Sequence, residues 1–139
     1  MPIRNWTPEA IMQAALDEQE KRMRLAVVLI QGKVRQLINR GQKKRRSGNR
    51  YVGLDPSKPG EPPKKLSNLL FTSIATEVIR QKRQVIGVVG TNVKYARRLE
   101  LGFVGTDRLG RRINQAPRPY LRRAMLENRD AVSRILRGK

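Results

Sequence analysis

The sequence contains no cysteine and no histidine, and each absence removes a class of chemistry. Without cysteine the chain can form neither disulfides nor thiolate metal ligands, and it has no sulfur nucleophile. Without histidine it lacks the side chain that most often serves as a general base or binds a transition metal. A catalytic site would therefore have to be assembled from the eleven carboxylates.

The carboxylates show no catalytic pattern. The acidic residues at 17–20 stand beside Lys21 and Arg22 on the polar side of a predicted helix, as solvated ion pairs do. Glu100 differs because it lies among apolar residues in a short predicted helix, and we expect it to pair with an arginine. No carboxylate pair has metal-site spacing, and the glycines form no phosphate loop. The sequence thus predicts no catalytic residue, no metal, no cofactor and no enzyme.

Aromatic residues and long apolar runs are also scarce. Aromatics make up 4% of the chain, too few for an interleaved platform that stacks single-stranded bases. No zinc-finger, helix-turn-helix or RNA-recognition pattern is present. No segment approaches the roughly 20 apolar residues of a membrane span, and the first residues lack the apolar core of a signal peptide. We expect a protein used in a cytoplasm, or inside a particle assembled there, with no membrane partner.

Positive charge is what the sequence has in excess, with 31 Lys and Arg against 11 acidic residues. Residues 40–50 and residues 108–123 each hold six basic residues and no acid. Such clusters suit the phosphate backbone of a nucleic acid, an acidic protein neighbour, or a solubilising surface, and the sequence leaves these open. The residues expected to face DNA or a partner are Lys43, Lys44, Arg45, Arg46, Arg50, Arg108, Arg111 and Arg112.

A long amphipathic helix is predicted near the N-terminus. Thr7-Pro8-Glu9 has the form of a helix start, and Asn39-Arg40-Gly41 that of a stop. About 32 residues would span roughly 48 Å. This exceeds the width of one small domain, so one end should project or pack on a neighbouring subunit; a helix broken near Gly32 is the alternative. Its apolar stripe is Met12, Leu16, Met23, Val27, Ile30, Val34 and Leu37.

The rest of the chain alternates loops with short elements. A mobile, basic, proline-rich arm is expected at about 42–66, then a helical turn at 68–71, and strands at 74–80 and 85–89 joined by the loop 81–84. A short helix should follow at 93–101 with Tyr95 and Leu99 inward. A second mobile loop is expected at about 103–117, with a strand as the alternative.

A last helix should open at Pro119 and end before Gly138. Its inner face would be Leu121, Met125, Val132, Ile135 and Leu136. The sequence therefore predicts a single α+β domain over residues 1–139. A long N-terminal helix and a small antiparallel sheet would be packed by the short helix and the C-terminal helix.

Ordered motifs in the second half of the chain resemble a known family. They are Ser57–Pro63 (SKPGEPP) followed by Leu66–Ile74 (LSNLLFTSI), then Val89–Gly102 (VGTNVKYARRLELG), then Ala116–Ala124 (APRPYLRRA). Their order and spacing are similar to those of the phage morphogenesis family of neck or tail-completion proteins of long-tailed bacteriophages. Here Gly102 is followed by a longer basic segment than is usual in that family.

The resemblance implies a virion protein of the neck or tail region, made in the host cytoplasm. Its subunits would form a homo-oligomeric ring, a hexamer or dodecamer, at the head–tail junction. The ring would contact connector, stopper or tail proteins and could touch packaged DNA non-specifically, without catalytic residues. The expected core or interface anchors are Val27, Ile30, Val34, Tyr95, Leu99, Glu100, Arg118 and Tyr120. Glu100 would offer an arginine partner across subunits, and Arg118 would orient the last helix. The alternative is a non-specific nucleic-acid-binding protein.

Overall fold

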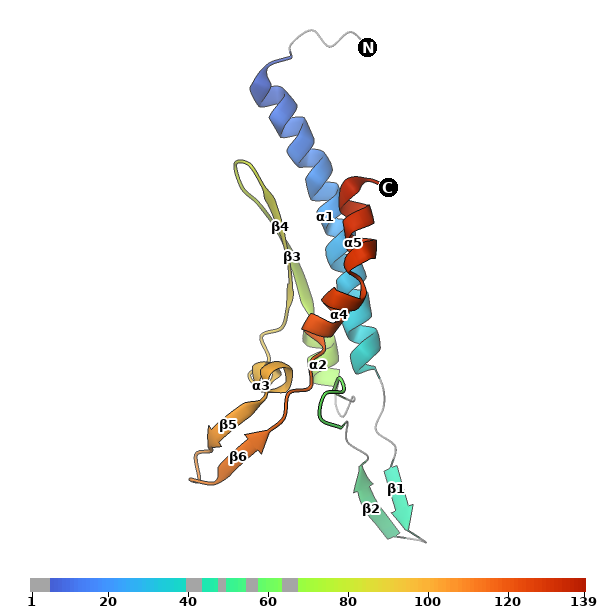
Figure 1. The fold of residues 1–139 in the computed structure, drawn as a ribbon, viewed down its shortest axis with the longest axis vertical. Coiled ribbons are helices and arrows are strands. Elements are labelled where there is room, and N and C mark those ends of the chain that lie inside the picture. The colour runs from blue at the N-terminus through green and yellow to red at the C-terminus, as the bar shows by residue number, and fades with distance from the viewer. Residues whose placement is uncertain (1–5, 40–43, 48–49, 55–57, 64–67) are drawn as a thin grey trace.

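One long helix organises the molecule, which a computed structural model describes at residues 6–39, 44–47, 50–54, 58–63 and 68–139. Helix α1 (Pro8–Ile38) runs along the long axis, and the other elements pack beside its C-terminal part or extend from one end (Figure 1). Thr7 caps α1, because its hydroxyl accepts the Ala10 N–H at 3.1 Å. Asn39 ends it by donating its N–H to the Arg35 carbonyl at 2.8 Å. The helix passes through Gly32 without a break, so the alternative of two shorter helices is wrong.

The α+β class is confirmed, and within the described ranges the strands form three separate antiparallel hairpins. They are β1 (Lys44–Ser47) with β2 (Arg50–Leu54), β3 (Ala75–Arg80) with β4 (Val85–Gly90), and β5 (Phe103–Thr106) with β6 (Arg112–Gln115). The β3–β4 hairpin and its loop at 81–84 lie where the sequence predicts them. The other two hairpins fall in segments that the sequence assigns to loops, so those two assignments are corrected.

The β5–β6 hairpin forms because a specific turn joins two very short strands. Asp107 accepts the N–H groups of Leu109 and Arg111 on one carboxylate oxygen, both at 2.9 Å. Gly110 follows at φ 74°, a left-handed conformation that glycine adopts without steric cost. Strands of four residues are too short to show a convincing period of two in the sequence, which explains why the segment reads as a loop.

The buried core cluster lies between the C-terminal half of α1, residues 70–74, Ala96 and residues 120–124, and the β3–β4 hairpin contributes the partly buried Val89 to its edge. Figure 1 shows the hairpin along one side of α1 and the C-terminal helices along the other. The stripe residues Leu16, Val27, Ile30 and Val34 are buried, but Met12, in the second turn of α1, is exposed. The other buried residues of the hydrophobic core are Ala26, Ile38, Leu70, Ile74, Ala96, Tyr120 and Ala124.

The C-terminal segment is two helices where one is predicted. Helix α4 (Leu121–Glu127) ends at Asn128, and α5 (Arg129–Arg137) follows and ends at Gly138 with φ 75°. The Ala124 carbonyl accepts both the Asn128 side chain at 2.8 Å and the Asn128 backbone N–H at 3.2 Å, so this asparagine bonds twice to the end of α4. The break changes the inward face, so Met125 is exposed while Ala124 is buried. Pro119 precedes α4 and does not occupy its first position.

A glycine lets β4 lie directly on α1. A Cβ at Gly87 would come within 2.5 Å of the Val27 Cγ1 and 2.6 Å of the Met23 Sδ, closer than such atoms can approach. The pairing of Val78 with Gly87 places this close approach at the middle of the hairpin. The small residue therefore sets the distance between the hairpin and the helix.

The remaining short helices are α2 (Asn68–Ser73) and α3 (Ala96–Leu101). Helix α2 confirms the predicted turn after the proline-rich segment, and it leads into the fully buried Ile74. The Ile74 carbonyl accepts from the Gln31 side chain at 2.8 Å and from the Arg35 guanidinium at 3.1 Å. These bonds fix the start of β3 against the C-terminal half of α1.

Candidate functional site

Three segments that are distant in the sequence meet at one junction. The Gly60 N–H donates to the Pro117 carbonyl at 2.9 Å, and the Arg118 N–H donates to the Leu99 carbonyl at 2.6 Å. The carboxylate of Glu100 accepts from the start of α4. Residues 58–63, 96–102 and 116–122 are thus joined by hydrogen bonds. We call this region the junction, and it contains part of each stretch in which the family resemblance lies.

Glu100 is the centre of the junction. Its Oε2 accepts the N–H groups of Tyr120 and Leu121 at 2.8 and 3.0 Å, and its Oε1 accepts that of Arg122 at 2.9 Å. The first N–H groups of a helix have no partner within the helix, and a carboxylate there also complements the helix dipole. Tyr120, the N-cap residue, makes no side-chain cap of its own. Glu100 therefore caps α4 from α3, where the sequence predicts an arginine partner within the chain, and its pairing with an arginine across subunits stays a prediction.

Tyr120 anchors the junction to the core. Its side chain is fully buried, and its hydroxyl donates to the Ala96 carbonyl at 3.4 Å. Burial, with the nearby negative charge of Glu100 and then Tyr95, raises the pKa of Tyr120 to about 12. The hydroxyl therefore stays protonated at physiological pH and serves as a hydrogen-bond donor.

Tyr95 does not take the inward position that the sequence predicts. It is 41% exposed, and the adjacent Ala96 is buried in its place. The large Tyr120 ring fills the core beside α3, so only a small residue fits at the first position of that helix. Leu99 packs against the core as expected.

Gly102 and Arg118 shape the exit from the junction. Gly102 ends α3 with φ 76°, and a Cβ there would lie 2.7 Å from the Gln115 carbonyl oxygen. Arg118 contributes through its backbone, while its buried Nε atom has no hydrogen-bond partner among the described residues. Because Gly102 lies so close to the Gln115 backbone, the β5–β6 hairpin begins directly beside α3 and extends away from the core (Figure 1).

The β5–β6 hairpin has one covered face and one open face. The Arg98 guanidinium stacks 4.0 Å from the centre of the Phe103 ring, and that ring covers Gly105. Val104 points to the opposite face, together with Arg112 and Asn114. Val104 is 81% exposed and Leu109, in the turn, is 76% exposed. The hairpin therefore presents apolar side chains to solvent.

Basic residues surround these exposed apolar side chains. Arg108 and Arg112 are exposed, while the Arg111 Nε pairs with the Asp107 carboxylate at 2.7 Å. The backbone N–H of Arg111, its guanidinium and the Leu109 N–H hold the pKa of Asp107 below its ordinary value. Of the three predicted basic residues in this segment, Arg111 is thus partly neutralised within the turn.

The other predicted basic residues lie on the β1–β2 hairpin or before it. Lys44, Arg45 and Arg46 belong to β1 and Arg50 to β2, with a register shift between Arg45 and Arg46. Lys43 lies outside the described residues. Figure 1 shows the β1–β2 and β5–β6 hairpins extending from the same end of the molecule, opposite the N-terminal end of α1.

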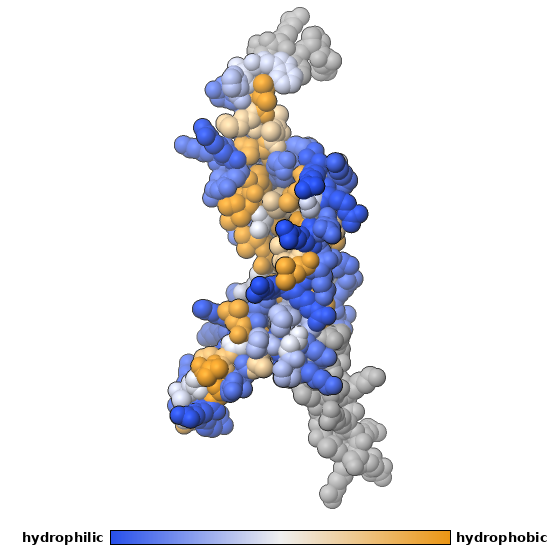
Figure 2. Space-filling view, in the orientation of Figure 1, coloured by the Kyte–Doolittle hydropathy of each residue, from blue (hydrophilic) through white to orange (hydrophobic). Residues whose placement is uncertain are grey.

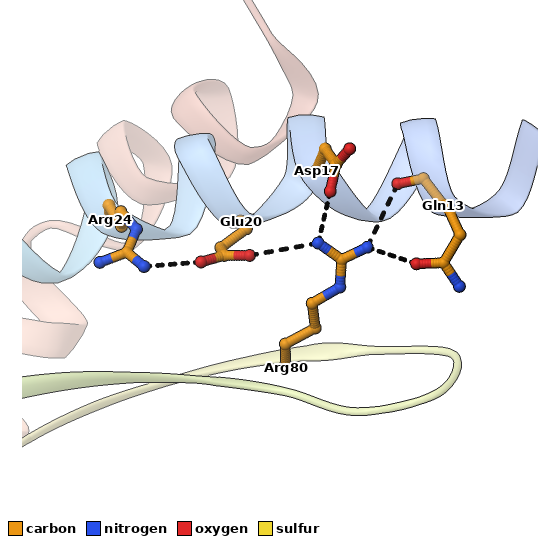
Figure 3. Close-up of polar contacts among 5 residues, drawn as sticks. All are labelled: Gln13, Asp17, Glu20, Arg24 and Arg80. Carbon is orange, nitrogen blue, oxygen red and sulfur yellow. Dashed lines mark hydrogen bonds and ion pairs between the residues drawn. The ribbon is translucent and has the colours of Figure 1, made fainter. Parts of the chain in front are cut away.

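A polar cluster that the sequence analysis does not identify joins the β3–β4 hairpin to α1 (Figure 3). Arg80, at the end of β3, contacts Asp17, Glu20 at 3.4 Å, and the Gln13 side chain at 2.6 Å. Arg24 also pairs with Glu20, at 2.6 Å. Hydrogen bonds from Arg24 and Arg80 lower the pKa of Glu20. The sequence shows the charges but not the register that brings residue 80 opposite residue 17.

The described residues contain no group of three acidic side chains that could hold a metal ion. Within the same ranges, no helix is long and apolar enough to cross a membrane. The chemistry at the junction consists of hydrogen bonding and packing. Comparison of the chain with protein-family models, with curated proteins and with solved structures found no match.

Proposed function

We propose that this chain is a structural subunit of the ring that joins capsid to tail in a tailed bacteriophage. The observation that carries the proposal is the junction. Stretches around residues 60, 100 and 118 resemble the phage morphogenesis family in order and spacing, and in this fold they bond to one another. A chance similarity of scattered short motifs would give no reason for the motifs to meet.

The distribution of elements suits a subunit that makes several contacts. Two hairpins extend from one end of the molecule, and α1 projects at the other (Figure 1). Leu25 and Val28 are exposed on α1, away from its buried stripe. Surfaces of this kind suit contacts with identical neighbours in a ring of six or twelve copies. They also suit contacts with connector, stopper or tail proteins above and below.

The proposed role is not enzymatic. Glu100, the carboxylate placed among apolar residues, is used by three backbone N–H groups, and the Tyr120 hydroxyl is buried and protonated. Both side chains therefore hold the fold together. The basic β1–β2 hairpin would face the DNA channel and meet phosphates without reading bases.

A second candidate is a non-specific nucleic-acid-binding protein that forms no ring. The formal net charge of +20 favours it, because cationic chains bind nucleic acids through counterion release alone. The two candidates differ in what they predict about assembly. A ring subunit forms a closed particle with defined neighbours, whereas a simple cationic binder coats DNA without fixed stoichiometry.

Electron microscopy tests the proposal. The chain would be purified alone and after co-expression with the products of the adjacent genes. We expect closed rings, or rings docked on a neighbour, in the co-expressed sample. Irregular complexes that form only when DNA is added, with no ring in any combination, would favour the second candidate.

A further inference from the structure

The long axis of the molecule is electrically asymmetric. Residues 6–20 contain four carboxylates and no lysine or arginine, so all 31 basic residues lie elsewhere in the chain. Three of these carboxylates, Asp17, Glu18 and Glu20, pair with arginines of the same molecule. Glu9 is exposed in the first turn of α1. Within residues 6–20 the helix therefore carries carboxylates and no basic side chain of its own, although Arg4 lies just before it in the chain.

This end of α1 also exposes apolar side chains. Trp6 is 61% exposed and Ile11 is 46% exposed, and Met12 beside them is exposed too. Trp6 and Ile11 occupy the positions on either side of a helix cap that often contact each other, but that contact would leave their outer surfaces open. Figure 1 shows α1 projecting here past both the β3–β4 hairpin and α5. The loop at 81–84 of the adjacent hairpin carries Lys82 and Arg83, so at this end the carboxylate in the first turn of the helix, Glu9, is the group suited to a cationic partner.

The β5–β6 hairpin is complementary to this helix end. One face of this two-stranded hairpin is covered by Arg98 stacked on Phe103, and a surface on its open face would stabilise it further. Its open face carries Val104 and Arg112, and its turn carries Arg108 and Leu109, all of them exposed. Figure 2 shows hydrophobic side chains on the upper part of α1 and again over this hairpin, whose tip is strongly hydrophilic.

We propose that the projecting end of α1, residues 6–12, binds the open face of the β5–β6 hairpin of a second copy of this chain. Two copies with a net charge of +20 repel each other, and most pairs of their surfaces would place cation against cation. The contact between helix end and hairpin avoids that opposition and brings Glu9 toward Arg108 and Arg112. It also buries Trp6 and Ile11 against Val104 and Leu109.

The contact joins two different surfaces, so each copy retains one free helix end and one free hairpin. Such a heterologous contact repeats from copy to copy and closes into a ring where the rotation permits. The inference thus rests on the proposed function, because it names the subunit contact of the proposed ring. It assigns the β5–β6 hairpin to protein contact and leaves the β1–β2 hairpin for DNA.

Engineered cysteines test the contact, because the chain has none of its own. An Ile11→Cys variant labelled with heavy nitrogen would be mixed with an unlabelled Val104→Cys variant at low salt under mild oxidation. Intact mass then distinguishes mixed from like disulfides, and we expect mixed dimers to exceed both like dimers severalfold. The matched control is Val28→Cys, at an exposed position of α1 outside the contact, mixed with Val104→Cys. Equal cross-linking in the control, or no mixed excess, would overturn the proposal.

Charge-bearing variants give an independent readout by sedimentation. The Ile11→Asp variant keeps an intact hairpin, and the Val104→Asp variant keeps an intact helix end. Each alone should remain monomeric, whereas their equimolar mixture should form a one-to-one dimer and nothing larger. Variants that associate with themselves as the wild type does would overturn the contact. The contact would also be overturned if Val104→Asp weakened binding to duplex DNA and left self-association unchanged. If the variants form the mixed dimer but the wild type shows no rings in electron microscopy, the contact would be supported and the proposed ring refuted. Failure of the contact and failure of the proposed function are therefore distinguishable.

Discussion

At the scale of single residues, Glu100 shows how a carboxylate placed among apolar residues can cap a helix from a distant part of the chain. Its two oxygens accept three N–H groups at the start of α4, and α4 has no cap within its own segment. The sequence places Glu100 in a short helix, but it cannot show which distant backbone lies within reach. A side chain that caps a helix from elsewhere in the chain leaves no local pattern, and for this reason the arginine pairing was the natural expectation.

Replacing Glu100 by alanine should therefore destabilise the fold. Loss of a helix cap costs about 0.5–2 kcal/mol, and the partly buried N–H groups left without partners place the expected loss in the upper part of that range. Thermal and urea unfolding would measure the loss. The control is Glu127→Ala, which removes only an exposed pair with Arg123 and should change the free energy of unfolding little. Equal effects of both variants would contradict the capping role.

Asp107 gives a prediction about pH. Hydrogen bonds from Arg111 and Leu109 hold its folded-state pKa below the ordinary value of 3.8. A group with a lowered folded-state pKa contributes its stabilisation fully above the unfolded-state value, and the contribution disappears as the pH falls through the folded-state pKa. The turn of the β5–β6 hairpin should therefore stay ordered down to about pH 4 and loosen below it.

Amide chemical shifts of Leu109 and Arg111 would follow this titration, and both should change with a common midpoint below 3.8. In an Asp107→Asn variant the same shifts should be independent of pH over this range, because no carboxylate is left to titrate. A midpoint at or above 3.8 in the wild type would show that these hydrogen bonds do not hold the turn in solution.

At the scale of elements, local signals predict the helices and strands that are long or well capped. The Thr7-Pro8-Glu9 start and the periodic stripe place α1 to within a residue, and the β-branched runs place β3 and β4. The sequence signal fails where structure depends on a few residues at a turn or break. Asp107 and Gly110 define the β5–β6 turn, and Asn128 divides the last helix. Neither feature produces a visible change in the spacing of apolar residues along the sequence.

The packing of β4 on α1 gives the prediction for this scale. A Gly87→Ala substitution would place its Cβ 2.5 Å from Val27 and 2.6 Å from Met23, so the hairpin would have to move away from the helix. Overpacking of this kind costs about 1–3 kcal/mol. The Gly90→Ala substitution in the same strand meets nothing within 4 Å and is the matched control. Chemical unfolding should separate the two variants, and equal stabilities would show that β4 does not lie this close to α1.

At the scale of the whole molecule, charge and shape act together. The net charge of +20 follows from the sequence alone, but its meaning depends on where the elements carry it. The two hairpins from the predicted loop segments extend from the same end, opposite the least cationic part of α1 (Figure 1). The sequence analysis could name the basic residues because composition is local. It could not divide them between surfaces, because that division depends on how distant segments meet at the junction.

The last prediction concerns the β1–β2 hairpin, where the ring subunit and the simple nucleic-acid binder differ. We expect the free protein to bind duplex DNA weakly, without sequence preference, and with a steep dependence on salt. Neutralising Lys43, Lys44, Arg45 and Arg46 together should lower the slope of log affinity against log salt by about 0.9 for each phosphate that the protein no longer neutralises. Circular dichroism should show the fold unchanged, since the core described around α1 is built from apolar side chains.

The matched variant neutralises Arg108 and Arg112 on the other hairpin. If the assignment of surfaces is right, this second variant should reduce self-association and leave the DNA salt slope nearly unchanged, while the first variant does the reverse. If the residues at 43–46 instead dock on an acidic neighbour, their neutralisation should abolish attachment of that neighbour, and DNA binding should persist. A structure of the assembled neck with residues 43–46 on the outer surface, away from DNA and protein alike, would contradict both roles. The charge would then serve solubility alone.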